Sequence, residues 1–330
     1  MRLVLVVGVF LAAAAVPDLA AAHVGKTLPV ATDFTARITT SVPGVTAKVV
    51  DGDQSLWVRA SVPVAVPGIL GEPLLRFDAH GVWLNLRSPT AQSDRIDRTD
   101  LRPSATGRPP LWHRLTTGHA YLWHEHRLHA LETIARGAGS AGPWSVPFVV
   151  DGRQRSMRGV LDYAAPGPIW AWIAAGVALS LAAAARAVRS TATVVVLALA
   201  ATVAVWTVRL GRELYGRPGT PVVGWIEIAI TCLVGSLFVL GLTRRDSGTR
   251  VFTAFFVGFG ALYEGLTMLP LLTHAIALNA VPSTVARVLE VVVLAAGVGT
   301  LAGSIFGRVI EDEPARALSE VGTDTCGAAG

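Results

Sequence analysis

The sequence predicts a protein of two parts: an all-β exported domain, either a sandwich or a small barrel, followed by an α-helical transmembrane domain of about five helices. Three observations predict this architecture. The 330 residues are 52% hydrophobic and only 15% charged, well below the roughly 25% charged residues of ordinary soluble domains. Beyond residue 167 the apolar residues gather into long runs. Before it, short β-branched runs alternate with turn-forming pairs.

Residues 1–22 have the features of a secretory signal peptide. Arg2 precedes an apolar run over 3–16, and small residues occupy 20–22. The run is shorter than the ~20 residues that a spanning helix needs, so an uncleaved anchor is the weaker alternative. Cleavage leaves His23 at or near the new amino terminus, where imidazole and free amine together suit Cu(II). Alternatively, His23 merely follows the cut and has no ligand role.

Residues 23–166 form the predicted exported β domain. Strand-like runs are followed by Asp51-Gly52 and by Asp151-Gly152, and both pairs are signals for a β-hairpin. Frequent turns without a long helical run indicate a sandwich or a small barrel. Both cysteines of the chain lie beyond residue 230. The domain must therefore be stabilised by its own core rather than by disulfides.

The densest group of chemically active side chains is the histidine string, Trp123-His124-Glu125-His126-Arg127-Leu128-His129. On a strand, His124 and His126 point to one face and Glu125 to the other. Imidazole nitrogens suit Cu(II), Zn(II) or Ni(II), and a nearby carboxylate commonly orients a ligand imidazole. The candidate metal ligands are His124, His126, His129, His113 and His23, with His119 as a further donor, and the candidate orienting carboxylates are Glu125 and Glu132.

Two alternatives stay open for the histidine string. Trp123, Glu125 and Arg127 can form a buried polar network that locks a loop onto the domain, with the histidines hydrogen-bonded to backbone. The cluster can instead respond to pH, because the pKa of an unperturbed histidine lies at about 6.5.

Four segments resemble an actinobacterial family of multi-pass membrane proteins that carry an exported domain. These segments are Gly71–Phe77 (GEPLLRF), Gly81–Asn85 (GVWLN), Ser88–Thr90 (SPT) and the histidine string (WHEHRLH). The resemblance implies the layout of an exported domain before several membrane helices, and it carries over no activity. The chain departs from the family pattern at Glu125, where an aspartate is expected, and at Ala130, where an aromatic residue is expected.

Residues 167–306 form the predicted transmembrane domain, which makes the lipid bilayer a partner of the chain. Each apolar run is near the length that spans a bilayer, and residues 307–330 are expected to be a disordered cytoplasmic tail. The five runs are Ile169–Ala185, Thr191–Val208, Val222–Leu242, Val251–Leu271 and Val288–Phe306.

Arginine and tryptophan positions predict the orientation in the plasma membrane. With the β domain outside the cytoplasm, more arginines fall in the inner loops and tail than in the outer loops. Tryptophans then fall at the outer helix ends, as an interfacial belt requires. These tryptophans are Trp170, Trp172, Trp206 and Trp225.

Three carboxylates interrupt the apolar runs, and charged groups inside a membrane usually mark a pathway or a pair. Glu227, Glu264 and Glu290 all fall in the outer half of the predicted bilayer, together with His274 and Arg287. They form a candidate polar relay in the membrane. The simpler alternative is pairing, because Arg287 and Glu290 are three residues apart on one helix.

The remaining features restrict the class of function. The net charge of +5 is spread along the chain, which disfavours nucleic acid as a partner. The chain contains no nucleophile elbow, phosphate loop or HExxH helix, so an enzyme has little support. The leading hypothesis is an envelope membrane protein whose exported domain binds a transition metal, copper before zinc, for sensing, delivery or resistance. The alternative is a non-catalytic scaffold that docks onto an envelope protein.

Overall fold

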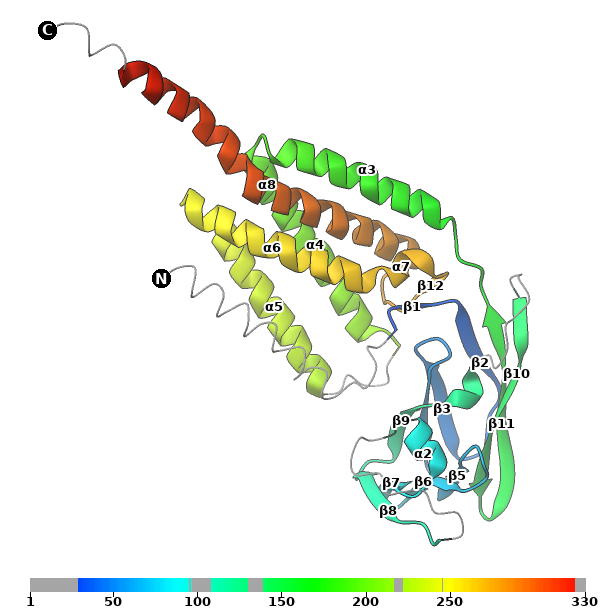
Figure 1. The fold of residues 1–330 in the computed structure, drawn as a ribbon. Helices are drawn as coiled ribbons and strands as arrows, with labels where there is room; N and C mark the ends of the chain where they lie inside the picture. The colour runs from blue at the N-terminus through cyan, green and yellow to red at the C-terminus, as the bar shows by residue number, and fades with distance from the viewer. Residues whose placement is uncertain are drawn as a thin grey trace, which may run out of the picture. The chain divides into compact units, whose positions relative to one another are not determined.

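The computed structural model describes residues 29–94, 96, 108–129, 139–216, 222–244 and 246–323. The chain divides into two compact units (Figure 1). The β unit contains Phe34–Ala164. The helical unit contains Ala165 onward together with the short segment Val30–Asp33. A mainly β region followed by a mainly helical region confirms the predicted fold class.

The β unit consists of two antiparallel sheets. Their inner faces share one hydrophobic core, to which Leu56 and Trp123 contribute from the smaller sheet and Phe77 and Phe148 from the larger, so the unit is a sandwich. The seven-stranded sheet has the order β2 (Phe34–Thr40), β11 (Arg153–Tyr163), β10 (Gly139–Val150), β5 (Val64–Pro67), β6 (Pro73–Asp78), β7 (Gly81–Asn85) and β8 (Trp112–Thr116). The three-stranded sheet has the order β3 (Val45–Val50), β4 (Ser55–Ala60) and β9 (Ala120–His124).

Both predicted hairpins form, and both use left-handed backbone at the turn. Val150 pairs with Arg153 across Asp151-Gly152, where φ is +50° and +68°. Two successive positive φ values give the turn whose twist matches that of the flanking strands. Along β10 the residues from Trp144 to Val150 alternate between buried and more exposed positions, so the hairpin buries one face of the strand in the core.

The helical unit contains five long helices. They are α3 (Ile169–Ala187), α4 (Thr191–Leu214), α5 (Val222–Leu242), α6 (Ser247–Met268) and α8 (Ser283–Thr323), with the short α7 (Pro270–Thr273) between the last two. Four segments of the described chain are long and apolar enough to cross a membrane: 169–187, 191–214, 248–273 and 283–307. In α5 the apolar stretch with described side chains is the shorter Cys232–Leu242. The helices therefore fit a membrane protein.

Two differences from the expected boundaries concern the ends of the helical unit. Helix α8 continues to Thr323, into the region expected to be a disordered tail, because extending an existing helix is far easier than starting one.

In addition, β1 (Ala31–Thr32) pairs with β12 (Ile276–Ala277). The Asp33 carboxylate also accepts a hydrogen bond from the Ala275 amide at 2.7 Å. Residues 30–33, expected within the β domain, thus belong to the helical unit.

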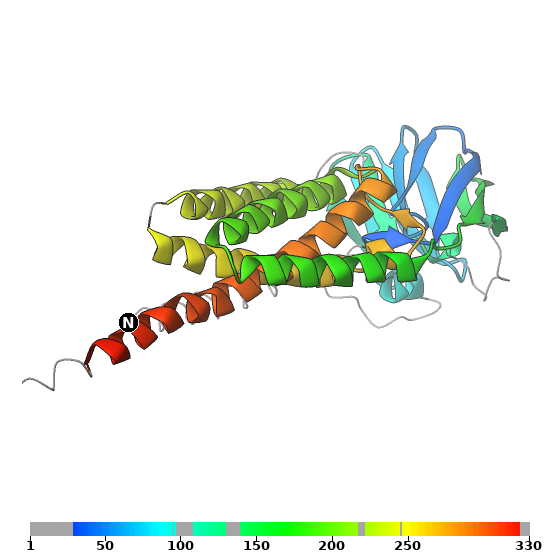
Figure 2. The same cartoon turned by 90° about the horizontal axis from the view of Figure 1, so that it is seen from above.

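Small residues allow the long helices to pack closely. Helices α3 and α8 lie side by side in both views (Figures 1 and 2). A Cβ atom placed on Gly299 or Gly303 of α8 would come within 2.9 Å of Ala183 or Ala187 on α3. Close approach through glycine and alanine is typical of helix pairs in membranes.

Candidate functional site

The histidine string turns immediately after strand β9. The strand ends at His124, and Glu125 caps a 3₁₀ helix over His126–Leu128. The prediction that His124 and His126 share one face of a strand is therefore wrong. The Glu125 side chain bonds to the following backbone amide at Arg127, and such a local side-chain bond favours a cap or turn over a continued strand.

The turn nevertheless gathers three imidazole rings. The ring centroids of His124 and His126 are 4.7 Å apart, those of His124 and His129 are 4.9 Å apart, and those of His126 and His129 are 5.7 Å apart. The Nε2 atoms of His124 and His129 are separated by 3.4 Å. Three of the predicted ligands are thus brought together.

Two aspartates that the sequence did not single out contact these rings. The Asp53 carboxylate, in the loop between β3 and β4, lies 3.0 Å from His129 Nδ1. The Asp94 carboxylate, at the end of the short helix α2 (Pro89–Ser93), lies 2.5 Å from His126 Nδ1. An ionised carboxylate only accepts hydrogen bonds, so beside an ionised Asp53 the Nδ1 atom of His129 carries hydrogen. In the neutral ring, Nε2 is then left with its lone pair.

Burial controls the protonation of Asp94. Its side chain has no exposed surface, and this burial, aided by the nearby negative charge of Glu125, raises the pKa of Asp94 to about 6. The charges of His126 and Arg127 act in the opposite direction but do not cancel the effect of burial. Asp94 therefore titrates in the same pH range as an ordinary histidine.

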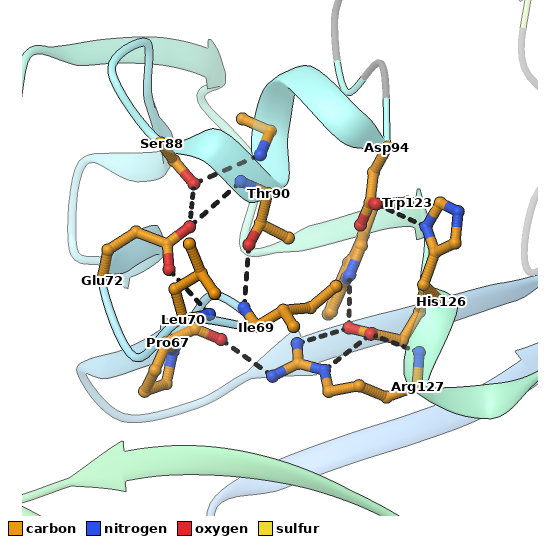
Figure 3. A network of polar contacts seen from close by, with 12 residues as sticks. Pro67, Ile69, Leu70, Glu72, Ser88, Thr90, Asp94, Trp123, His126 and Arg127 are labelled. Atoms are coloured by element: carbon orange, nitrogen blue, oxygen red, sulfur yellow. Dashed lines mark hydrogen bonds and ion pairs between the residues drawn. The ribbon is translucent and has the colours of Figure 1, made fainter. Parts of the chain in front are cut away.

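Glu125 has a different role from the one expected of it. Its fully buried carboxylate accepts hydrogen bonds from Trp123 Nε1 at 3.0 Å and from Arg127 Nε and NH2 at 2.7 and 2.6 Å (Figure 3). Arg127 in turn donates to the Pro67 carbonyl at 2.9 Å. Asp53 and Asp94, rather than Glu125, are the carboxylates in contact with imidazoles. The Glu125 network instead corresponds to the alternative that was left open, a buried lock on the turn.

A second carboxylate fixes the helix that carries Asp94. Glu72 accepts hydrogen bonds from the Ser88 hydroxyl at 2.7 Å and the Thr90 amide at 3.1 Å, at the start of α2 (Figure 3). Burial alone would raise the pKa of Glu72, but the bonds from Ser88 and Thr90 outweigh it and hold the pKa below its usual value. The ionised Glu72 thus anchors the first turn of α2.

The other predicted residues of the β domain lie elsewhere. His113 is on β8, in the seven-stranded sheet, with an exposed side chain. His119 Nδ1 lies 3.2 Å from the Asp78 carbonyl oxygen. His23 and Glu132 lie outside the described residues. Within the part of the chain that the structure describes, no group of three or more His, Cys, Asp or Glu side chains already has the geometry of a metal site.

The predicted polar group of the membrane helices is only partly assembled. Glu264 pairs with Arg209 at 2.7 Å, and both line a small cavity with Glu290. Arg287 does not make the expected pair with Glu290. It donates instead to three backbone carbonyls, those of Leu271, His274 and Ala275, because the end of α7 leaves carbonyls without helical partners.

The two remaining members of that group are placed as follows. His274 Nδ1 lies 2.9 Å from the Thr273 hydroxyl, and Glu227 lies on α5 with its side chain outside the described residues.

Comparison of the chain with family models, curated proteins and solved structures finds no match. Membership of the actinobacterial family therefore stays a prediction.

Proposed function

We propose that the protein is a multi-pass membrane protein of the cell envelope whose β unit lies outside the cytoplasm and binds one divalent transition-metal ion. His124 and His129 supply the first two ligands through Nε2, and His126 supplies the third after its ring turns toward them. The ion serves sensing, delivery or resistance, and no catalytic step is assigned to the site.

The observation that carries the proposal is the separation of 3.4 Å between the two Nε2 atoms. Two nitrogen ligands held ~2.0–2.1 Å from a tetrahedral ion lie about 3.4 Å apart. Adjacent ligands in a square plane around Cu(II) lie about 2.9 Å apart. The spacing supports tetrahedral coordination, which Zn(II) prefers, and copper remains the second candidate.

Chemistry around the rings supports the same proposal. If Asp53 fixes the hydrogen of His129 on Nδ1, then the His129 Nε2 lone pair faces the Nε2 atom of His124. Two lone pairs in that position repel each other unless a proton or a cation lies between them. Asp53 and Asp94 add negative charge beside the rings, which favours a cation, and a carboxylate behind an imidazole is the usual support of a metal ligand.

Titration of the purified full-length protein in detergent tests the proposal. Zn(II) and Cu(II) are added separately and the heat of binding is measured. We expect sub-micromolar binding of one ion, which the variant His124→Ala/His129→Ala loses. The exposed His113→Ala is the matched control and keeps the affinity. His23→Ala identifies any separate copper site at the amino terminus. An unchanged affinity in the double variant contradicts the proposal.

The buried Glu125 network favours the second candidate function, a scaffold that docks onto an envelope partner. In that case the turn over 124–129 stabilises the β unit and its histidines hold no ion. The same titration separates the two functions. A scaffold shows no specific binding of either metal, while the double histidine variant lowers the thermal unfolding midpoint.

A further inference from the structure

Three charged side chains from three helices meet at one end of the helical unit. Arg209 lies near the end of α4, Glu264 near the end of α6 and Glu290 near the start of α8. They line one cavity of about 10 Å³, whose other walls are the apolar residues Val205, Val208, Met268 and Val293. A space of this volume holds about one water molecule.

The charges in this cavity do not balance. Arg209 NH1 lies 2.7 Å from a carboxylate oxygen of Glu264. Glu290 is only 1% exposed, and its Oε1 has no hydrogen-bond partner among the described residues. Two carboxylates and one guanidinium leave one negative charge on a buried group. An ionised carboxylate without a donor is very unfavourable in such a place, so the site requires one further positive charge.

We propose that this cavity is a proton-binding site, in which Glu264 and Glu290 hold one proton between them and Arg209 pairs with whichever carboxylate is ionised. The structure corresponds to the state with the proton on Glu290 and Arg209 on Glu264. Binding converts one carboxylate and one proton into a carboxylic acid, and release returns the proton to water. Glu227, expected in the same relay, is not needed for this arrangement.

The walls of the cavity favour a proton over a metal ion. Metal cations such as Mg²⁺ or Ca²⁺ are held by about six or more oxygen ligands. Here the side-chain oxygens are those of two glutamates, one of which is already paired with Arg209, and the remaining walls are apolar. Helices α3 and α7 also pack against α8 but contribute no residue to these walls. A proton needs only one carboxylate oxygen.

A larger cavity gives the proton a path. It has a volume of about 290 Å³, lies between α4, α5 and α6, and shares Val205, Arg209 and Glu264 with the small cavity. The ion pair thus borders both spaces, whereas Glu290 lines only the small one. Movement of Arg209 from Glu264 to Glu290 would rearrange a side chain that lines both cavities, which couples proton release to a change in the ion pair.

Infrared spectroscopy of the full-length protein in lipid vesicles tests this inference. The carbonyl band of a protonated carboxylic acid is measured at mildly alkaline pH, where Asp94 is ionised. We expect such a band in the wild-type protein and its loss in Glu290→Gln. Glu264→Gln should also lose the band, although it leaves Glu290 in place, because Arg209 is then free to pair with Glu290 and ionise it.

Each other outcome overturns a stated part of the inference. Absence of the band in the wild-type protein, or its persistence in Glu290→Gln, excludes a proton on Glu290. Persistence in Glu264→Gln excludes sharing through Arg209. Both substitutions keep the size of the side chain, and the thermal unfolding midpoint of each variant verifies that it folds. Because neither readout uses a metal, this test and the metal titration succeed or fail separately.

Discussion

The Nε2 atoms of His124 and His129 lie 3.4 Å apart, while Nδ1 of His129 is held 3.0 Å from the carboxylate of Asp53. The His129 imidazole is thus held through Nδ1 by Asp53, and its Nε2 atom faces the His124 imidazole. If the site binds a metal ion as proposed, a proton and the metal ion compete for the space between the two Nε2 atoms. Metal binding would then depend on pH.

Metal affinity should fall as the pH is lowered through the range in which histidines titrate. Each ligand must lose its proton before it can bind, so binding releases protons. We expect Zn(II) affinity to decrease steadily as the pH is lowered, because protons then compete with the ion for the imidazole nitrogens, as measured by calorimetric titration at several pH values. An affinity that does not change across this range would exclude imidazole ligands.

Asp53→Asn should weaken metal binding without removing a ligand. The amide can accept a hydrogen bond from His129 Nδ1 but carries no negative charge, so His129 becomes a weaker ligand. Loss of such a supporting carboxylate typically lowers metal affinity by about 10–100-fold. The measurement is the same titration, with Asp78→Asn in the seven-stranded sheet as the control. Equal affinities for Asp53→Asn and wild type would show that Asp53 does not support the site.

Glu125→Ala should strongly destabilise the β unit. The substitution leaves Trp123 Nε1 and the guanidinium of Arg127 without their buried acceptor. Removal of one partner from a buried ion pair costs about 3–5 kcal/mol. Chemical denaturation followed by tryptophan fluorescence measures the free energy of unfolding. Asp162→Ala breaks the exposed pair with Arg37 and is the matched control, with an expected cost of about 0–1 kcal/mol.

The stability of the β unit should depend on pH through Asp94. Its pKa is raised in the folded protein from the usual 3.8 to about 6, so between these values the folded state binds more protons than the unfolded state. Stability from this group is therefore full below pH 3.8 and is lost as the pH rises toward about 6. Unfolding midpoints measured across this window should decline less in Asp94→Asn than in wild type. Equal slopes would mean that Asp94 is not the group responsible.

The proposed orientation predicts labelling from outside the cell. Arg155 is exposed on β11, and Arg155→Cys in a background with Cys232 and Cys326 replaced by serine introduces a single thiol. A membrane-impermeant maleimide should label this thiol in intact cells as completely as after lysis. Labelling that requires lysis would place the β unit in the cytoplasm and remove the basis for an exported site.

Local patterns allowed much of this fold to be predicted. The pair Asp151-Gly152 predicted a hairpin because its left-handed turn is dictated by two adjacent residues. The apolar runs predicted the long helices because length and hydropathy decide membrane crossing. The three clustered imidazoles were likewise found from their density in the chain, although the assumed strand over 124–126 proved to be a turn.

Contacts between distant segments could not be predicted in this way. Asp53 and Asp94 reach the histidines only because the core of the sandwich brings a hairpin loop and the end of α2 to the turn after β9. Arg209 meets Glu264 only when α4 and α6 pack together. No periodicity or motif in one segment contains information on such a partner, since the pairing is a property of tertiary packing.

The pairing of β1 with β12 makes the β unit an insertion rather than an appendage. The chain leaves the helical unit after Asp33 and re-enters it at Ala165, so two covalent tethers join the units. A single proteolytic cut in the tether after Tyr163 would leave the β unit covalently joined only to β1, which is held to the rest of the helical unit by its noncovalent pairing with β12 and by the hydrogen bond from Ala275 to Asp33. During synthesis, β1 must also wait until residues 276–277 have been made, so the first strand of the described chain completes its pairing among the last.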